Sequence, residues 1–142
     1  MIKYPISFHA RSESASGIGK IWQIESQNLK IDCAVPVEFE GPGGAFSPED
    51  LFAQALTNCF VATFKVYAEK SNLGFGQVIA TSELIVDLAE NKKPVMKKCF
   101  LKVKILDCEN AERVKFIAKK AFEAGFILNS VKTEVVLDLE VA

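Results

Sequence analysis

SPEDLFAQALTNCF, residues 47–60, is the stretch that decides the predicted fold. Ser47 is a residue type that caps helices, Pro48 is favoured at the first helical position, and the acidic residues that follow stabilise the positive end of the helix dipole. Apolar residues then recur at helical spacing on one face and also cover much of the remaining surface. The pattern predicts a helix from Pro48 to about Lys70 that is buried nearly all round.

The segments on either side of this helix alternate apolar and polar residues, as strands do, and one further helix lies near the end of the chain. The order of the elements predicts an α+β fold in a single domain over residues 1–142. The expected elements are a β-meander up to about Val37, a hairpin of strands over Val78–Leu88 and Met96–Leu106, a helix that Asn110 caps and Gly125 stops, and a last strand over Ser130–Val141.

The composition limits the partners of the chain. Hydrophobic residues make up 49% of the sequence, and 17 basic residues against 18 acidic ones leave a net charge of -1. No block of basic residues is present, so neither nucleic acid nor a membrane is expected as a partner. The most apolar run, Leu51–Tyr67, includes polar residues and is shorter than the ~20 residues that span a bilayer. The N-terminal residues show no apolar stretch typical of a signal peptide, which predicts a cytoplasmic protein.

The four cysteines and the single histidine are not spaced like the ligands of a metal site. We therefore expect no metal, no bound cofactor and no disulfide framework. Cys33 and Cys99 each fall on the apolar side of an alternating strand, so both are expected in the core. Cys108 follows a turn and is expected at the surface. His9 is expected on a first strand, in a structural role.

Cys59 lies in the long predicted helix and allows two interpretations. It is a packing residue, as buried free cysteines commonly are, or it is a reactive thiol. A reactive thiol needs a neighbouring positive charge, and the positive end of the helix dipole is about 15 Å away. The chain has two arginines, Arg11 and Arg113, and the sequence places neither beside Cys59. On spacing alone the packing role is favoured.

Residues 41–60, GPGGAFSPEDLFAQALTNCF, resemble the signature of the OsmC/Ohr superfamily of thiol-dependent peroxidases. A glycine-rich loop leads into a Pro-Glu helix start, and a cysteine–aromatic pair, Cys59 and Phe60, begins ten residues after Glu49. The order of elements along the whole chain is similar to that of the family as well. The resemblance therefore supports a chemical role for Cys59.

The resemblance implies an OsmC-like fold in an intertwined homodimer, in which the long helices lie at the centre, antiparallel sheets from both chains wrap them, and the active sites form at the interface. It implies that Cys59 is the peroxidatic cysteine and that Glu49 orients its neighbours in the site. The implied substrates are small hydroperoxides, either organic hydroperoxides or hydrogen peroxide. The implied reductant is an external thiol such as a lipoyl-type dithiol.

Two features of the residues agree with a homodimer. A helix that is apolar all round in so small a domain needs a cover, which a partner chain would supply. Glu49 and Cys59 lie about 15 Å apart along the predicted helix. A site that uses both residues is therefore expected to draw one of them from the other subunit.

Three positions differ from the pattern of the family. Gly125 stands where the resolving cysteine is implied. Gly17 in the early glycine-rich turn and Glu38 before the glycine-rich loop stand where the two branches of the family carry an arginine. The resemblance then implies a one-cysteine hydroperoxide reductase, in which an external thiol resolves the oxidised cysteine and Lys20 or Arg11 replaces the missing arginine.

An alternative of a different class remains. The chain is then an OsmC-like protein without peroxidase activity that binds a small apolar ligand or a partner at the dimer interface, with Cys59 as a packing residue. Under the peroxidase interpretation, the apolar surroundings of Cys59, Phe60 among them, favour an organic hydroperoxide. The sequence leaves open whether Cys33 or Cys99 acts as a second thiol.

Overall fold

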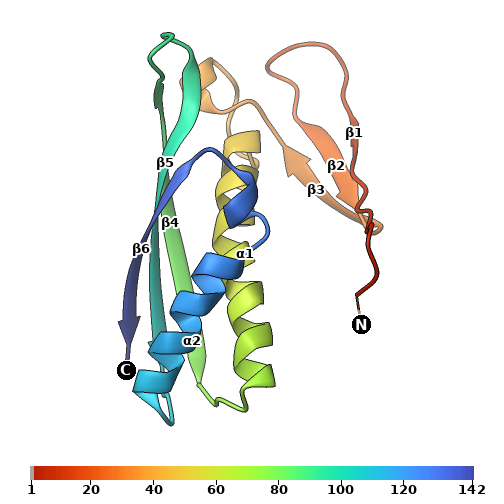
Figure 1. Ribbon diagram of the computed structural model, residues 1–142. Helices are drawn as coiled ribbons and strands as arrows, with labels where there is room; N and C mark the ends of the chain where they lie inside the picture. Colours follow the sequence, from red (N-terminus) through yellow and green to blue (C-terminus); the bar gives the residue numbers. More distant parts are fainter. Residues whose placement is uncertain (1) are drawn as a thin grey trace. The chain divides into compact units, whose positions relative to one another are not determined.

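The computed structural model describes residues 2–142, and this range contains two α-helices and two three-stranded sheets, an α+β fold (Figure 1). The chain divides into two compact units, residues 1–51 and residues 52–142. The single domain over residues 1–142 stays a prediction. No helix in the described range has both the length and the apolar character needed to cross a membrane.

The first unit contains the predicted β-meander, three antiparallel strands in the order β1-β2-β3. Gln27 and Asn28 both have positive φ and form the tight two-residue turn between the second and third strands. His9 lies before the first strand, so the prediction that placed it on a strand is wrong: the chain pairs with its neighbour only from Arg11 onward. The strands are β1 (Arg11–Glu13), β2 (Trp22–Ser26) and β3 (Leu29–Cys33).

The loop after β3 needs glycine at three positions, for space at one and for backbone conformation at two. A Cβ atom on Gly41 would overlap the backbone carbonyl of Val35, so a side chain cannot be placed there without moving the backbone. Gly43 and Gly44 have φ values of +62° and +78°, in the left-handed region that favours glycine. The loop therefore fixes how the chain enters the long helix.

Helix α1 covers Pro48–Lys70, as the sequence predicts. Its first turn is closed by a reciprocal pair of hydrogen bonds. The backbone N–H of Asp50 donates to Oγ of Ser47 at 3.0 Å, and the backbone N–H of Ser47 donates to Oδ2 of Asp50 at 3.0 Å. This capping box satisfies two N–H groups that the helix itself leaves unpaired, which is why the helix begins here.

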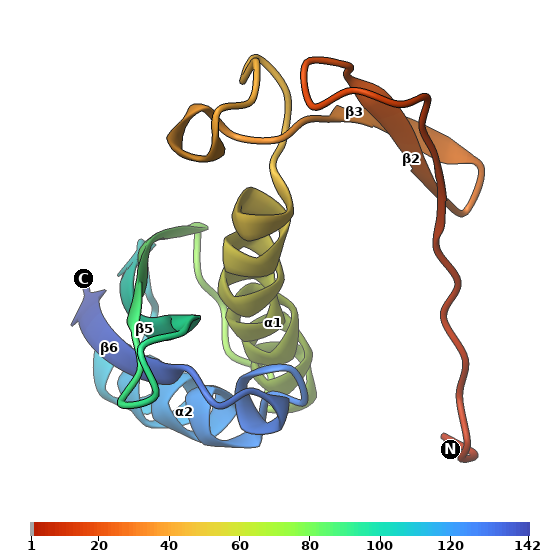
Figure 2. The ribbon, with the colours of Figure 1, turned by 90° about the horizontal axis from the view of Figure 1, so that it is seen from above.

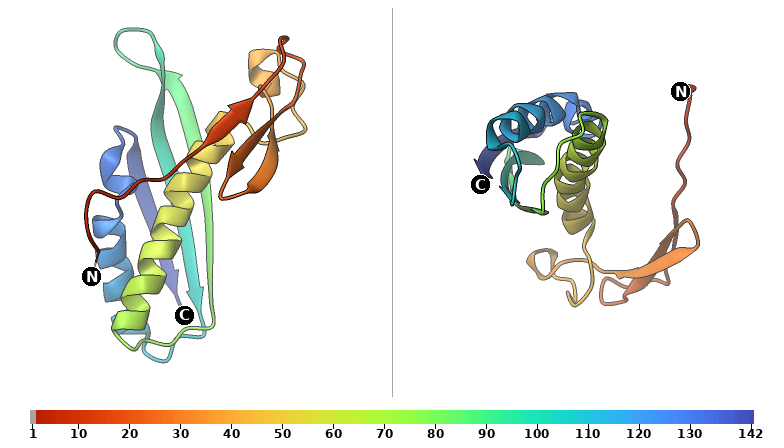
Figure 3. Two further views of the ribbon diagram at one scale, coloured as in Figure 1. Left: turned by 90° about the vertical axis from the view of Figure 1, so that its right-hand side faces the viewer. Right: turned by 90° about the horizontal axis from the view of Figure 1, so that it is seen from below.

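The second unit places both helices against one face of a sheet of order β4-β5-β6 (Figure 2 and Figure 3). The first two strands form the predicted antiparallel hairpin. The last strand runs parallel to β5, so the prediction of an antiparallel sheet is wrong for this pair: helix α2 carries the chain back along the sheet before β6 begins. The elements are β4 (Gln77–Leu88), β5 (Pro94–Leu106), α2 (Ala111–Ala124) and β6 (Glu134–Val141).

The ends of α2 follow the sequence prediction, and the start of β6 does not. The side chain of Asn110 accepts a hydrogen bond of 3.2 Å from the backbone N–H of Arg113, and the helix ends before Gly125. The last strand begins at Glu134 and not at Ser130. Residues Leu128–Ser130 form a 3-10 turn instead, and the hydroxyl of Ser130 donates to the carbonyl of Phe126 at 2.6 Å.

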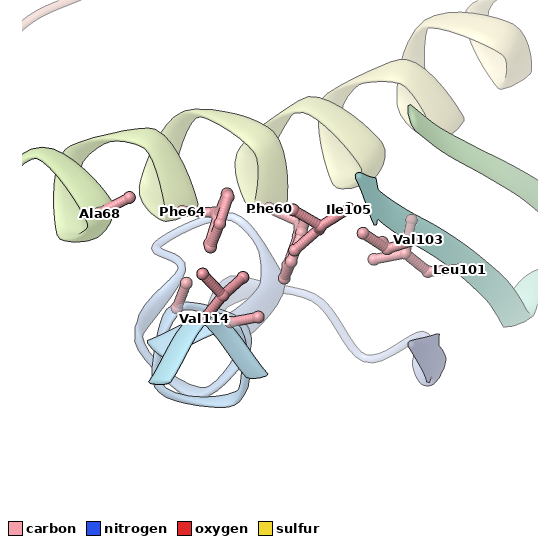
Figure 4. Packing of buried hydrophobic residues seen from close by; sticks show 9 residues of the cluster. Phe60, Phe64, Ala68, Leu101, Val103, Ile105 and Val114 are labelled. Atoms are coloured by element: carbon pink, nitrogen blue, oxygen red, sulfur yellow. The ribbon is translucent and has the colours of Figure 1, made fainter. Parts of the chain in front are cut away.

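The core of the second unit lies between α1, α2 and the middle strand of the sheet (Figure 4). Each element contributes its residues at its own period, three or four residues apart on the helices and two apart on the strand. Cys99, on the same side of β5, is also fully buried, as predicted. The cluster consists of Phe60, Phe64 and Ala68 from α1, Leu101, Val103 and Ile105 from β5, and Val114, Ala118 and Ala121 from α2.

Within a single chain, α1 is buried over only part of its surface. Its buried side chains include Leu56, Phe60 and Phe64, whereas Val66 on another side is 49% exposed. The sequence predicts a helix that is buried nearly all round. A single chain therefore covers only part of the apolar surface of α1, and the predicted burial nearly all round is not seen within it.

The contact between Gly41 and Val35 gives a test of the loop. We expect Gly41→Ala to lower the free energy of unfolding by about 1–3 kcal/mol, because the new methyl group overlaps the carbonyl of Val35. Gly19→Ala is the matched control, since a Cβ atom there meets nothing within 4 Å. Urea unfolding measures both, and equal stabilities of the two variants would contradict the packing of the loop.

Candidate active site

The sulfur of Cys59 packs against the end of the second helix. Cys59 is 9% exposed. A Cβ atom placed on Gly125 would lie 2.8 Å from Sγ of Cys59 and 3.0 Å from Cδ1 of Leu128. These distances are shorter than an ordinary contact between such atoms, so sulfur and leucine together fill the space that a side chain at position 125 would need.

Gly125 is required here for space and not for its backbone conformation. Its φ of -61° suits any residue. Its N–H donates to the carbonyl of Ala121 at 3.1 Å, and its carbonyl accepts from the N–H of Asn129 at 3.0 Å. The backbone that faces the thiol is therefore held on both sides. The sequence identifies Gly125 as a helix stop, but no local signal shows that Cys59 lies against it.

Cys99 is connected through Ser82 to Thr57, which lies on a different side of α1 from Cys59. Its thiol interacts with the hydroxyl of Ser82, which lies 2.7 Å from the hydroxyl of Thr57; Thr57 in turn donates to the carbonyl of Ala53 at 2.8 Å. Burial raises the pKa of the Cys99 thiol, and the hydrogen bond with Ser82 offsets part of that rise. Thr57 precedes Cys59 by two residues, about 200° around the helix. The thiols of Cys59 and Cys99 thus face opposite sides of α1.

Cys108 lies at the far end of α2 from Cys59. It precedes the helix, whereas Cys59 contacts the residue that follows it, and the 14 residues of α2 span about 21 Å. The thiol is partly buried and donates weakly to the carbonyl of Ile105 at 3.8 Å, so the predicted surface position holds only in part. Burial and the neighbouring carboxylate of Asp107 both raise its pKa.

Glu49 lies close to Cys33 within the first unit. Cys33 is 2% exposed, as predicted for a core residue. Its pKa is raised chiefly by burial and also by the carboxylates of Glu49 and Asp50, while a hydrogen bond from the backbone of Ala34 lowers it. Oε1 of Glu49 is buried and has no hydrogen-bond partner among residues 2–142. Such an oxygen is costly to leave unpaired, so Glu49 requires a donor.

The two predicted site residues, Glu49 and Cys59, occupy one helix ten residues apart, which corresponds to a rise of about 15 Å. The structure brings Gly125, and not Glu49, next to Cys59. Glu49 is instead placed near Cys33. Sequence reasoning identified all of these residues but missed the last pairing, because it joins a strand and a helix start across the glycine-rich loop.

The sequence offers three cationic side chains as neighbours of a reactive thiol, and each has a defined local environment. Arg113 lies in the first turn of α2, at the opposite end from Gly125. Arg11, in the first unit, forms an exposed ion pair of 2.9 Å with Glu13. Lys20 is exposed in the turn that contains Gly17, and its N–H donates to the Gly17 carbonyl at 3.1 Å.

The described residues also contain an open hollow of about 860 Å³ in the second unit. Phe52, Val95, Met96 and Val131 supply apolar walls, and Lys97 and Lys132 lie beside them. Cys59 does not line it. Over residues 2–142, no group of three or more His, Cys, Asp or Glu side chains gathers as metal ligands would.

Comparisons with known proteins match the chain over nearly its whole length. The family model described as OsmC-like protein matches residues 41–140. An uncharacterized protein of Bacillus subtilis, YmaD, is 23% identical over 137 residues, which cover 94% of this chain and 91% of that protein.

Two solved structures share the fold. An OsmC-like protein of unknown function from Vibrio cholerae has a TM-score of 0.81 and 20% identity, covering 95% of this chain and 99% of its own. An organic hydroperoxide resistance protein OsmC from Legionella pneumophila has a TM-score of 0.74 and 26% identity, covering 99% of each chain.

The contact of Cys59 with Gly125 is tested by a double-mutant cycle. We expect Gly125→Ala to lower the free energy of unfolding by about 1–3 kcal/mol, because its methyl group would lie 2.8 Å from the sulfur. In a Cys59→Ala background the sulfur is absent, and we expect the loss to be smaller by about 0.5 kcal/mol or more. Urea unfolding of the four proteins measures the difference; equal losses in both backgrounds would contradict the contact.

Proposed function

Because the chain belongs to the OsmC-like protein family of the OsmC/Ohr superfamily, we propose that it is a thiol-dependent peroxidase that reduces organic hydroperoxides, or hydrogen peroxide, through Cys59. The observation that carries the proposal is the place of Cys59. It follows the capped helix start within the matched segment, and its sulfur meets the end of α2 at position 125, where the family resemblance implies a second thiol. The likeness to the hydroperoxide resistance protein of Legionella pneumophila supports the substrate class.

The proposed reaction has two stages. The thiolate of Cys59 attacks the O–O bond of the hydroperoxide; the bond breaks, the sulfur becomes a sulfenic acid, and the leaving alkoxide takes up a proton to give the alcohol. An external thiol then attacks the sulfenic acid, which releases water and forms a mixed disulfide. A second thiol of the same reductant displaces Cys59 and leaves the reductant oxidised as a disulfide, so a dithiol of the lipoyl type completes the cycle alone.

The need for an external thiol follows from the positions of the chain's own cysteines. Gly125 has no thiol to offer, Cys99 faces the opposite side of α1, and Cys108 lies at the far end of α2. Within the second unit, no other cysteine is therefore positioned to condense with an oxidised Cys59. The proposal is accordingly a one-cysteine peroxidase.

Partly uncovered apolar surfaces support a homodimer. On the sheet of the first unit, Ile24 pairs with Ile31 and Ser26 with Leu29 on one face, and Leu29 and Ile31 are 73% and 40% exposed. Covering these apolar side chains would stabilise the sheet, because apolar surface removed from water lowers the free energy. The outer side of α1, where Val66 is exposed, is a second apolar surface that a partner chain could cover. In the proposed dimer, each chain covers these surfaces on its partner.

The same dimer offers a role to Glu49. Its buried oxygen requires a donor, and Glu49 and Cys59 are too far apart along α1 to act on one substrate within a single helix. We propose that Glu49 of one chain orients groups beside Cys59 of the other, and that Lys20 or Arg11 supplies the positive charge. We further propose that the protein works in the cytoplasm, where dithiol reductants are available.

The alternative is an OsmC-like protein that binds a small apolar ligand or a partner and has no peroxidase activity. The burial of Cys59 at 9% exposure and the apolar hollow beside Phe52 favour it. The chemical state of Cys59 after oxidation separates the two functions.

Trapping of the sulfenic acid tests the proposed activity. We expect cumene hydroperoxide followed by a sulfenate-specific reagent to label Cys59 stoichiometrically, with turnover that depends on an added dithiol. Peptide mass spectrometry locates the label, and Cys59→Ser abolishes both label and turnover. Cys108→Ser is the matched control, because the raised pKa of that thiol keeps it mostly protonated and slow to react. Labelling of Cys108 without Cys59 would exclude the peroxidase and favour the alternative.

A thiol introduced at position 125 tests the geometry of the site. In Gly125→Cys, the new Cβ atom lies close to the sulfur of Cys59, at 2.8 Å, and a disulfide places these atoms about 3 Å apart. We expect hydroperoxide to convert this variant to an internal disulfide, seen by mass spectrometry, with loss of the sulfenate label. Gly125→Ser is the control of equal size, and it should keep the label. A sulfenate that persists in Gly125→Cys would show that Cys59 does not face position 125 during the reaction.

A further inference from the structure

The hairpin of β4 and β5 extends past the start of β6. Strand β6 pairs with β5 only from Lys98 onward, so residues 94–97 have no neighbour on that side within the described chain. Figure 1 shows the turn of the hairpin beyond the start of β6. Two backbone bonds close this turn: the N–H of Ala89 donates to the carbonyl of Lys93 at 2.9 Å, and the N–H of Lys92 donates to the carbonyl of Ala89 at 2.8 Å. The hollow of about 860 Å³ lies at this end of the sheet.

A β-bulge places Lys97 at the hollow. Ile85 pairs with Lys98 and Val86 pairs with Met96, so Lys97 is an extra residue with no partner on β4. A bulge of this kind bends the strand and changes the direction of a side chain, and bulges are common next to functional sites. The residue that this bulge adds to β5 is a lysine, and it lines the hollow.

The wall of the hollow is largely apolar and comes from three parts of the second unit. Phe52 on α1, Met96 on β5 and Val131 in the loop before β6 line it, together with Val95, which is 38% exposed. Thr133 ties the loop to the hairpin, because its nearly buried hydroxyl donates to the carbonyl of Met96 at 2.7 Å. The wall is therefore formed before any ligand arrives, as is usual for small-molecule sites.

The rim of the hollow is positively charged. Lys97 and Lys132 line it and are exposed, and neither belongs to an ion pair within residues 2–142. Lys92 and Lys93 stand in the adjoining turn. Among the lining residues, Glu90 is the acidic one. A surplus of positive charge beside an apolar wall, in a chain whose net charge is -1, favours an anion with an apolar part.

We propose that the hollow binds an apolar carboxylate, an organic anion with one carboxylate group and an apolar body. The body packs against Phe52, Met96 and Val131, and the carboxylate accepts charge-assisted hydrogen bonds from Lys97 and Lys132. The volume of about 860 Å³ falls within the range of roughly 300–1,000 Å³ that small-molecule sites occupy. This site goes beyond the proposed function, because the lining residues do not include the candidate thiol and binding there needs no reaction of sulfur.

Charge and apolar area together select this ligand class. A neutral apolar molecule leaves the charges of Lys97 and Lys132 without a partner, and a cation is repelled by them. An inorganic anion such as phosphate has no apolar part to cover Phe52 and Val131. Lysine suits the task, since its flexible apolar stem lies along an apolar wall while its ammonium group reaches the carboxylate.

The methyl signal of Met96 tests binding at the hollow. The chain has two methionines, so an NMR spectrum of protein with labelled methionine methyl groups has two signals, and Met96→Leu assigns one of them. We expect decanoate to shift the Met96 signal saturably, and decanol, which has the same apolar chain without the charge, to bind about tenfold more weakly. Inorganic phosphate should leave the signal in place. A Met96 signal that decanoate does not move, or equal affinities for decanoate and decanol, would overturn the proposal.

Removing the two lysines tests the carboxylate position. We expect Lys97→Gln/Lys132→Gln to weaken decanoate binding about tenfold or more and to reduce its dependence on salt, because both ammonium groups are lost. Lys102→Gln/Lys115→Gln is the matched control: it removes the same charge from exposed positions on β5 and α2 that do not line the hollow. Equal losses in the two double variants would show that only the overall charge of the protein attracts the anion, and would refute the site.

A carboxylate placed in the wall tests the apolar part of the site. Val95 lines the hollow and is 38% exposed, so Val95→Asp should keep the fold and abolish the decanoate-dependent shift of the Met96 signal. Val136→Asp is the matched control, because Val136 is 37% exposed on β6 and does not line the hollow. Circular dichroism checks the fold of both variants. Binding that survives in Val95→Asp would contradict the proposed position of the apolar body.

The failure of this proposal can be told apart from that of the proposed function. Cys59→Ser removes the candidate thiol, and we expect this variant to bind decanoate with unchanged affinity. Loss of binding in Cys59→Ser would place the anion beside the sulfur instead of in the hollow, and so would overturn the separate site. The sulfenate label on Cys59 is read without decanoate, so its presence or absence decides only the peroxidase activity.

Discussion

The contact between the sulfur of Cys59 and the backbone of Gly125 is the constraint on which the second unit depends. It stands at one end of the seam where α1 meets α2, and Phe60, Phe64 and Ala68 continue that seam against the buried side of α2. A side chain at position 125 would push the end of α2 away from α1, since Cys59 and Leu128 already fill the space. The same contact sets the position of the thiol, so packing and candidate chemistry share one residue.

The sequence predicted the elements whose signals are local. The bounds of α1 follow from Ser47 and Pro48, and the start of α2 follows from Asn110, because a capping residue acts on backbone groups within one turn. Predictions failed at the starts of two strands. The 3-10 turn at Leu128–Ser130 delays the last strand, and His9 precedes the first ladder of hydrogen bonds. The contact of Cys59 with Gly125 joins residues far apart in the chain, so no local signal could reveal it.

Alternation in a sequence shows which face of an element is apolar but not what covers it. The sheet of the first unit, the outer side of α1 and residues 2–10 all carry apolar residues that one chain leaves exposed, among them Leu29, Val66 and Phe8. The sequence predicts that α1 is buried nearly all round because apolar residues occupy most of its surface, and such a pattern does not say what covers each face. These surfaces are the part of the fold that the single chain leaves uncovered.

Under the proposed function, the glycine at position 125 makes the second stage of the thiol cycle depend on an external thiol. The absence of a side chain lets the sulfur of Cys59 pack directly against the end of α2, where 9% of the residue is exposed. A thiol at that position would close the cycle within one chain; without it, the sulfenic acid persists until an external thiol arrives. Its lifetime is then set by how easily a reductant reaches a nearly buried sulfur. The same burial that keeps larger thiols out also limits further oxidation of the sulfenic acid, which requires a second hydroperoxide to reach the same atom.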